Sequence, residues 1–404
     1  MILPVSNNKH RNLLISIVMF MTMATLRILG ETSFITLLLE LISVGFFVLF
    51  LIANPRGSIY KYHYPRKALF IVLLGLSIIA VLRGFLEYGT GLTQIKEMFS
   101  RPKMIWPYFF PFLIGCSAFT FDYKLFYKWS SIITVAYAIL VVFNLNELIS
   151  TSFLLSQGVD VEKEVWSIST IFSVFSAPLV IFLQRDIVPK RTWYLAVFNF
   201  IVVFFVAIIN ARRSSVFGIS LVLFFAFIKD KRNRWISAIA FIFLILSMYE
   251  SGMLDFFISR VGQDSRSMVI DNFYEDMDSK SWIIGRGAAG TYFDSLGVFQ
   301  DIDGKRSEIE TGYLHLILKG GILYMVTYVL ALAYAAYLGV FRSKNSFVHS
   351  FGIIIFISLL ELIPYGIPTW NFKYLSIWMG VAICLNNRFR EMSNQEVKDF
   401  LHLE

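Results

Sequence analysis

Long runs of apolar residues, separated by short polar connections, dominate the chain. The runs cover residues 12–29, 34–53, 68–85, 104–119, 130–147, 168–184, 193–210, 214–228, 235–249, 322–341, 348–363 and 374–386. Most approach the length of about 20 residues that an α-helix needs to cross a bilayer. A transmembrane barrel would instead show short segments of alternating hydrophobicity. The pattern predicts an all-α fold, a polytopic transmembrane helix bundle of about 12 helices, with residues 1–404 forming a single integral membrane domain.

One long polar segment, residues 250–311, separates the ninth apolar run from the tenth. It is rich in Asp and Glu, and its end leads into an apolar helix. Within it, residues 253–260 suit a short helix on the membrane surface, or a loop packed on the bundle. The segment is too long and too polar for a tight turn, so we expect it to carry part of any active site.

Composition agrees with this picture, and the charges add an orientation. Hydrophobic residues make up 57% of the chain and charged residues 16%, whereas a soluble domain carries about 25% charged residues. Lys and Arg concentrate on alternate connections, while the connections at 148–167 and 250–311 are acidic. The positive-inside rule therefore predicts cytoplasmic termini and places segment 250–311 on the periplasmic side of a bacterial inner membrane. The net charge of +8 reflects this topology, so nucleic acid is not an expected partner.

Two adjacent arginines, Arg212 and Arg213, join two apolar runs on the non-cytoplasmic side. A charge at membrane depth is costly, so it normally pairs with another group or serves a function. One interpretation is a site for an anionic group such as a diphosphate, because guanidinium is a planar bidentate donor for phosphate oxygens. The other interpretation is an interfacial pair that meets lipid headgroups or the acidic segment.

Arg286 and Arg83 are further candidates for a positively charged lining. Arg286 lies between Gly285 and Gly287, where the backbone is free to turn and can aim the guanidinium inward. A solvent-exposed loop arginine is the alternative. Arg83 lies at the outer end of the third apolar run, where an arginine also snorkels to the interface.

Glu310, Tyr313 and His315 stand at the predicted start of a helix. Residues i and i+3 share a helix face, so Glu310 and Tyr313 project together while His315 is turned partly away. Glu310 or His315 could accept a hydroxyl proton as a general base. Each also has an ordinary explanation, because acidic residues favour helix N-termini and a single His is commonly structural.

Several familiar motifs are missing from the sequence. There is no Gly-x-x-x-x-Gly-Lys-Ser/Thr phosphate loop, no His-Glu-x-x-His motif and no Cys or His cluster. We therefore expect neither ATP hydrolysis nor a bound metal, and no cofactor.

Three motifs, in this order, resemble the bacterial O-antigen polymerase and O-antigen ligase superfamily of membrane glycosyltransferases. They are the arginine turn at 211–215, the segment Ile-Gly-Arg-Gly at 284–287, and residues 310–323, which read Glu-Thr-Gly-Tyr-Leu and end in Lys-Gly-Gly-Ile-Leu. The resemblance covers residues 200–341, and the N-terminal half matches only in hydropathy.

The resemblance implies a polymerase that joins oligosaccharide units carried on undecaprenyl diphosphate, at the periplasmic face and without nucleotide sugar or metal. Its partners would be these lipid-linked oligosaccharides, membrane lipid and a chain-length regulator protein. The implied diphosphate ligands are Arg212, Arg213, Arg286 and Arg83. The implied base is Glu310, with His315 as the competing candidate, and Tyr313 contacts sugar.

One departure helps to choose within the superfamily. Ligases carry a His, then a small polar residue, and a Gly at a fixed distance where a helix starts. That spacing places Glu310 at the His position and Gly321 at the Gly, which favours a polymerase. Two alternatives stay open: a ligase that transfers glycan to lipid A core, and a flippase or transporter of lipid-linked oligosaccharide. A two-fold hydropathy repeat would favour transport, and the sequence shows none.

Overall fold

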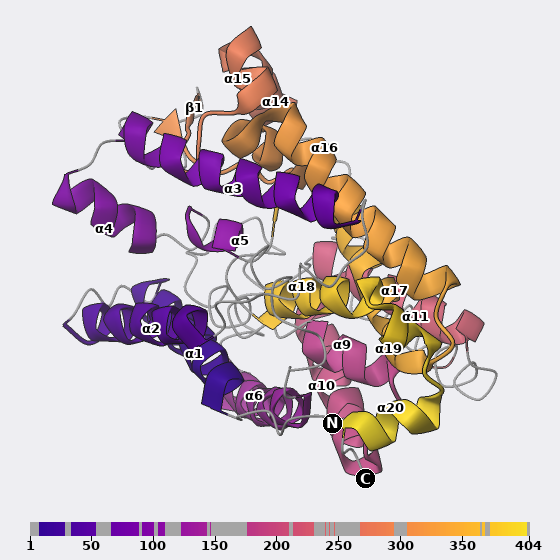
Figure 1. Ribbon diagram of the computed structural model, residues 1–404. Coiled ribbons are helices and arrows are strands. Elements are labelled where there is room, and N and C mark those ends of the chain that lie inside the picture. The colour runs from indigo at the N-terminus through magenta and orange to yellow at the C-terminus, as the bar shows by residue number, and fades with distance from the viewer. Residues whose placement is uncertain are drawn as a thin grey trace.

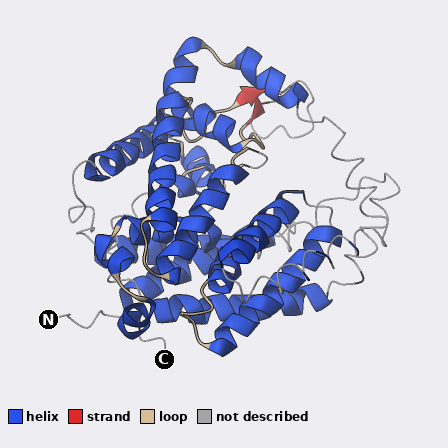
Figure 2. Cartoon of the chain, turned by 90° about the vertical axis from the view of Figure 1, so that its right-hand side faces the viewer, coloured by secondary structure: helices blue, strands red, loops and turns tan. Residues whose placement is uncertain are grey.

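The computed structural model describes residues 8–28, 34–53, 66–88, 91–100, 104–109, 123–143, 146, 176–209, 213–229, 239, 242, 246, 267–294, 305–363, 366–367 and 372–401. Helices make up 83% of these residues, and the strands among them form one two-stranded sheet, so the all-α prediction is confirmed (Figure 2).

The helices follow one another along the chain as α1 (Asn8–Ile28), α2 (Phe34–Ala53), α3 (Arg66–Tyr88), α4 (Leu92–Ser100), α5 (Trp106–Phe109), α6 (Tyr123–Phe143), α9 (Ser176–Leu183), α10 (Lys190–Ile209), α11 (Arg213–Lys229), α14 (Ser267–Asp276), α15 (Ser279–Ile284), α16 (Gly312–Phe341), α17 (Ser346–Glu361), α18 (Phe372–Leu385), α19 (Asn387–Glu391) and α20 (Asn394–Leu401). The strands β1 (Tyr292–Phe293) and β2 (Lys305–Arg306) are antiparallel, with Tyr292 opposite Arg306.

Two of the described helices are long and apolar enough to cross a membrane. They are residues Ala68–Glu87 of α3 and the whole of α16. Shorter apolar helices cover Arg11–Met23, Phe34–Phe50, Ser346–Glu361 and Lys373–Leu385. The bundle of about 12 helices stays a prediction. The proposed surface helix at 253–260 and most of the run at 235–249 lie outside the described residues.

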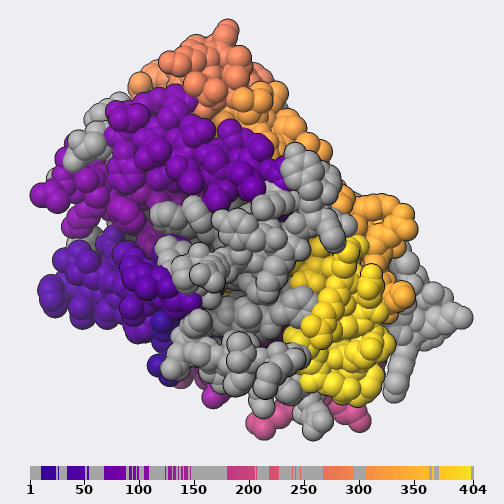
Figure 3. Space-filling model, in the orientation of Figure 1, coloured from indigo at the N-terminus to yellow at the C-terminus, as the bar shows by residue number. Residues whose placement is uncertain are grey.

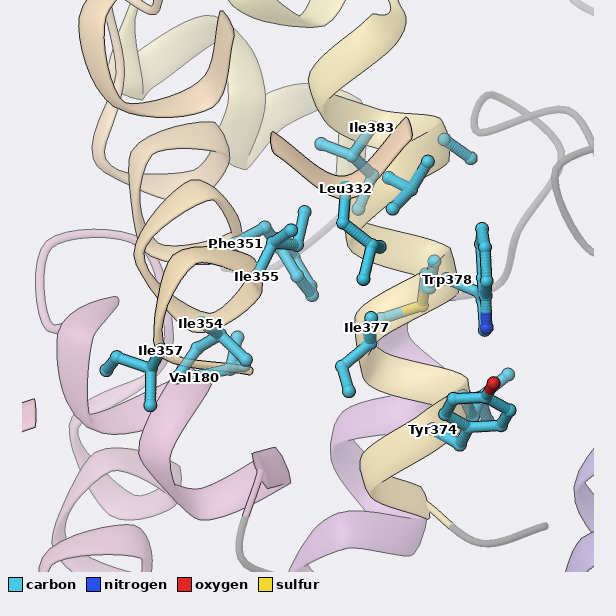
Figure 4. Close-up of a cluster of buried hydrophobic side chains, with 14 of the residues drawn as sticks. Val180, Leu332, Phe351, Ile354, Ile355, Ile357, Tyr374, Ile377, Trp378 and Ile383 are labelled. Carbon is cyan, nitrogen blue, oxygen red and sulfur yellow. The ribbon is translucent and has the colours of Figure 1, made fainter. Parts of the chain in front are cut away.

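The apolar core lies where α9, α16, α17 and α18 meet. Figure 4 shows Val180 of α9, Leu332 of α16, Phe351 and Ile355 of α17 and Ile377 of α18 pointing toward one another, and all five are buried. These side chains fill the space between neighbouring helices and fix their spacing by close packing.

Small residues bring α16 and α17 into close contact. A Cβ atom added to Gly339 of α16 would lie 2.7 Å from Cα of Gly352 in α17. The two backbones therefore touch at a point where neither helix has a side chain. Such small-residue interfaces are typical of helices packed in lipid, where van der Waals contact replaces the hydrophobic effect as the force between helices.

The central helix α16 is broken at one residue. Gly321 has φ 75° and ψ 179°, a conformation outside the helical region that is essentially restricted to glycine. The break leaves a short first part, 312–320, and a long second part, 322–341. At about 1.5 Å of rise per residue the second part measures about 30 Å, the thickness of a bilayer's hydrocarbon core. Its bounds coincide with those of the predicted tenth run.

The far end of α16 is joined to the C-terminal helices. Lys344 N donates to Arg390 O at 2.8 Å, and Asn345 Nδ2 donates to Phe389 O at 2.7 Å. Helices α19 and α20 thus lie at one end of α16, and α14 and α15 lie at the other (Figure 1).

A capping box begins α20. Glu396 Oε2 accepts from Ser393 N at 2.7 Å, and Ser393 Oγ accepts from Glu396 N at 3.3 Å. Each side chain thereby satisfies an amide that the first helical turn leaves without a partner. The hydrogen bond from the Ser393 backbone lowers the pKa of the Glu396 carboxyl.

Candidate functional site

Residues 267–294 and 305–311, here called the cap, form a small layer with a core of its own. Phe273 of α14, Met277 just after this helix and Tyr292 of β1 pack with Leu314 and Leu318 of α16. The two buried residues of α14 are four positions apart, which gives this helix one apolar face, and this face packs against α16. Figure 3 shows α14 and α15 of the cap at the top of the molecule, above α3.

A side chain caps the start of the short helix α15. Asp278 Oδ1 accepts a hydrogen bond from Ser281 N at 3.2 Å, so Asp278 is the N-cap of α15. The hydrogen bond with the Ser281 side chain, followed by that with its backbone, lowers the pKa of the Asp278 carboxyl. This short helix leads the chain directly into Gly285 and Arg286.

The turn after α15 docks on α16 through backbone groups, beside the break at Gly321. Arg286 N donates to Leu318 O at 2.7 Å, and Gly287 N donates to Lys319 O at 2.9 Å. Both acceptors belong to the last turn before the break, where helical carbonyls need partners from outside the helix. The cap thus supplies the hydrogen bonds that the break in α16 makes necessary.

The same turn also docks on α3. Ala288 N donates to Ala80 O at 2.7 Å. A Cβ on Gly287, which has φ 81°, would lie 2.5 Å from Gly84 N, and a Cβ on Gly84 would lie 3.1 Å from Ala288 N. We call this joint of the cap with α3 and α16 the seam. It is a contact of main chain on main chain.

Arg286 ties the parts of the cap together. Its Nη1 contacts the Asp276 carboxylate and donates to Thr291 O at 2.8 Å, and its Nε donates to Ser281 Oγ at 3.3 Å. Its Nη2 donates to the Asp276 carbonyl oxygen. The guanidinium therefore lies among groups of α14, α15 and Thr291, the residue before β1.

Arg83 holds the same turn from the side of α3. Its Nη1 donates to Ile284 O at 2.8 Å and to Gly285 O at 2.5 Å, and its Nη2 pairs with Glu87 at 2.5 Å. The structure thus brings Arg83 and Arg286 together at the seam. Their contacts favour roles in positioning the cap, and diphosphate binding by either one stays a prediction.

Removing the Arg286 side chain should loosen the cap. Arg286→Ala takes one donor from the Asp276 carboxylate, which Phe293 N also contacts, and one from each of two carbonyl oxygens. Hydrogen bonds to charged groups contribute about 1.5–3 kcal/mol each. We expect faster hydrogen exchange at 267–294 with little change at 346–361, measured by mass spectrometry in detergent. Lys280→Ala, an exposed change on α15, is the matched control. Unchanged exchange in the cap of Arg286→Ala would contradict this role.

Glu310 lies at the joint between the cap and α16. It precedes Thr311, the N-cap residue of α16, and its side chain is 54% exposed. Arg306 Nη2 lies 4.0 Å from Glu310 Oε1, while Arg306 Nη1 lies 3.5 Å from Oδ2 of the buried Asp294. A pair as long and as exposed as Arg306–Glu310 contributes little to stability. More than half of the Glu310 side chain is exposed to solvent.

Tyr313 and His315 occupy different environments in the first turn of α16. Tyr313 is partly buried and packs against the core of the cap. His315 is 1% exposed, and its backbone N donates to Thr311 O at 2.9 Å. Of the two candidate bases, Glu310 is thus the one that faces outward.

The arginine turn lies at the edge of the described chain. Arg213 is the first residue of α11, and its side chain, like the whole of Arg212, lies outside the described residues. Diphosphate binding by these two arginines stays a prediction.

Three charged residues at this end of the molecule were not assigned a role from the sequence. Lys319 is 1% exposed and its Nζ donates to Gly290 O at 2.8 Å. Glu361 Oε2 and Lys373 Nζ form an ion pair of 2.7 Å between α17 and α18. The sequence could have singled out each of these residues, because each is a charged residue inside or beside an apolar run.

Comparisons with known proteins give no assignment: no family model matches the chain, and no curated protein or solved structure matches it. Within the described residues, no group of three or more His, Cys, Asp or Glu side chains is placed to hold a metal ion. The described residues define an all-α protein that has, among them, two helices of membrane-spanning length, with a polar layer at one end of α16.

Proposed function

We propose that this protein is a membrane glycosyltransferase that polymerises oligosaccharide units carried on undecaprenyl diphosphate. The observation that carries the proposal is the placement of Glu310. Its exposed carboxylate lies where a polar cap meets a helix with a bilayer-length second part. A lipid-linked glycan needs such a place, because its diphosphate sits at the membrane surface and its sugars sit in water.

In the proposed reaction an acceptor hydroxyl attacks the anomeric carbon of the donor glycan. The new carbon–oxygen bond forms as the bond from that carbon to the phosphate oxygen breaks, and the electron pair leaves with undecaprenyl diphosphate. Glu310 takes the proton of the acceptor hydroxyl as general base. The buried His315 is the competing candidate, and it would need the cap to open.

Charge develops on the leaving diphosphate, and arginines can stabilise it by fixed, bidentate hydrogen bonds. We assign this role to Arg212 and Arg213. Arg83 and Arg286 contact groups of the cap. In this proposal they position the cap beside the site and do not bind the diphosphate. We assign the contact with sugar to Tyr313, which is partly buried at the same helix start.

The proposed setting is the bacterial inner membrane, with about twelve spans, cytoplasmic termini and the cap in the periplasm. The course of α16 supports this orientation. Its start carries the acidic cap and its end joins the basic connection that contains Arg342 and Lys344. Two polar layers at opposite ends of one apolar helix suit opposite faces of a membrane.

The purified protein should build polymer without nucleotide sugar. The substrate is the lipid-linked repeat unit extracted from cells that lack this gene, and the protein is supplied in lipid nanodiscs. We expect a ladder of glycan lengths on gels, insensitive to a metal chelator. Transfer of glycan to added lipid A core instead would indicate a ligase. Repeat units trapped in the cytoplasmic leaflet of the deletion strain would indicate a transporter.

A further inference from the structure

An ion pair between α17 and α18 lies close to the proposed site. Glu361 is the last residue of α17, and Lys373 is the second residue of α18. Lys373 Nζ and Glu361 Oε2 are 2.7 Å apart, and the two side chains are 18% and 16% exposed. The pair is largely buried, yet each side chain keeps a surface that a ligand can reach.

The pair adjoins the helix start that follows Glu310. Leu362, the residue after Glu361, accepts a hydrogen bond through its carbonyl oxygen from Gly312 N at 2.9 Å. Farther along the same connection, a Cβ on Gly366 would lie 3.6 Å from Glu310 O. The end of α17 is thus fastened to the start of α16, beside the proposed base.

The pair also adjoins α11, the helix that begins with Arg213. A Cβ on Gly218 would lie 2.8 Å from Glu361 Oε1, so the carboxylate lies directly on the α11 backbone. Arg213 precedes Gly218 by five residues, which is about 7.5 Å along a helix axis. The ion pair therefore lies between the helix that carries the arginine turn and the helix start that follows Glu310.

Energetics argue that the pair does more than join two helices. Removing two charges from water costs more than their attraction returns in many buried pairs, and apolar residues of similar volume often join helices as well. A lysine ammonium is a compact point charge that binds phosphate oxygens readily. A carboxylate beside it keeps that charge compensated when no anion is present.

We propose that Lys373 is a phosphate ligand of the lipid diphosphate, and that Glu361 is its counter-ion in the empty site. This inference rests on the proposed function. It assigns to α18 a cation for the leaving group, in addition to the arginines that precede and begin α11. Binding moves the Lys373 ammonium from the Glu361 carboxylate to a phosphate oxygen, with no bond made or broken.

Binding of two probes tests the proposal directly. Farnesyl diphosphate and inorganic pyrophosphate are titrated against the purified full chain in detergent, with thermal stability as readout. Lys373→Met should weaken farnesyl diphosphate binding by about 10–100-fold, the loss expected for one charge-assisted hydrogen bond. Glu361→Gln should leave binding equal or tighter, because it removes the competing anion. Lys344→Met, an exposed change at the other end of α16, is the matched control.

The two probes separate the sources of the anion. A Lys373-dependent response to farnesyl diphosphate alone indicates a lipid diphosphate, and an equal response to pyrophosphate indicates that the phosphates suffice. Either response supports the assignment of Lys373. Binding of both probes that is unchanged in Lys373→Met overturns it.

Two double variants separate ligand binding from a structural role. E361M/K373M removes both charges together, and E361K/K373E reverses the pair. If the pair only joins helices, both proteins accumulate, bind farnesyl diphosphate and polymerise as the wild type does, and the proposal is wrong. If Lys373 binds phosphate, each accumulated protein binds farnesyl diphosphate as weakly as Lys373→Met does. The wild-type protein could also bind the probes through Lys373 and yet make no ladder of glycan lengths. That result would refute the polymerase proposal and leave the diphosphate site standing.

Discussion

Gly321→Ala should detach the cap and leave little folded protein. The residue has φ 75° and ψ 179°, and a conformation that is essentially restricted to glycine costs other residues about 1–3 kcal/mol. A new Cβ would also overlap the carbonyl oxygen of Ile283 and lie 2.5 Å from Ile284 N. Because main-chain atoms on both sides of the seam cannot move independently, we expect a total loss of about 4 kcal/mol or more.

The measurement is protein level in membranes together with thermal unfolding of the purified protein. Gly75→Ala is the matched control, because Gly75 lies in α3 and a Cβ there meets no atom within 4 Å. That control should equal or exceed wild-type stability, since alanine favours a helix over glycine by about 1 kcal/mol. A Gly321→Ala protein as stable as the control would show that the seam is not needed for folding.

Glu310→Gln should lower the rate of glycan polymerisation by about 10²–10⁴-fold, the usual contribution of a general base. The substitution keeps the size of the side chain and removes only its ability to accept a proton. Protein level and melting temperature should stay unchanged, because the side chain is 54% exposed and its pairing with Arg306 is long. The measurement is the initial rate of ladder formation in nanodiscs.

Glu275→Gln, an exposed carboxylate on α14, controls for the loss of one negative charge from the cap. It should polymerise at the wild-type rate. If Glu310→Gln keeps that rate while a folded His315→Gln loses it, the base is His315, and the cap must open during the reaction.

The helices could largely be predicted from the sequence because hydropathy has a simple physical cause. The run at 322–341 coincides with the second part of α16, and the run at 34–53 coincides with α2. The break at Gly321 could not be placed in the same way, since Lys-Gly-Gly is compatible with a continuous helix. The helix α14 was also missed, because its apolar face consists of only Val269 and Phe273 and has a role only in packing against α16.

The contacts that the site residues make could not be predicted from the sequence. Arg286 lies between two glycines, which indicates a turn but not the Asp276 carboxylate that receives it. Glu361 and Lys373 are separated by a connection rich in proline and aromatic residues, and nothing local predicts that they meet. The exposure of Glu310 was easier to predict, because acidic residues favour helix N-termini and a carboxylate just before an apolar helix faces solvent.

The seam has a consequence for how such a chain can change over time. Its demands on the sequence are that side chains be absent at Gly84, Gly287 and Gly321, because the contacts are made by main-chain atoms. Elsewhere in the cap, the outward-facing positions carry no such demand. A few fixed glycines can therefore hold the architecture while most of the surrounding residues drift. Sequence likeness between proteins of this design can fade long before their shapes do.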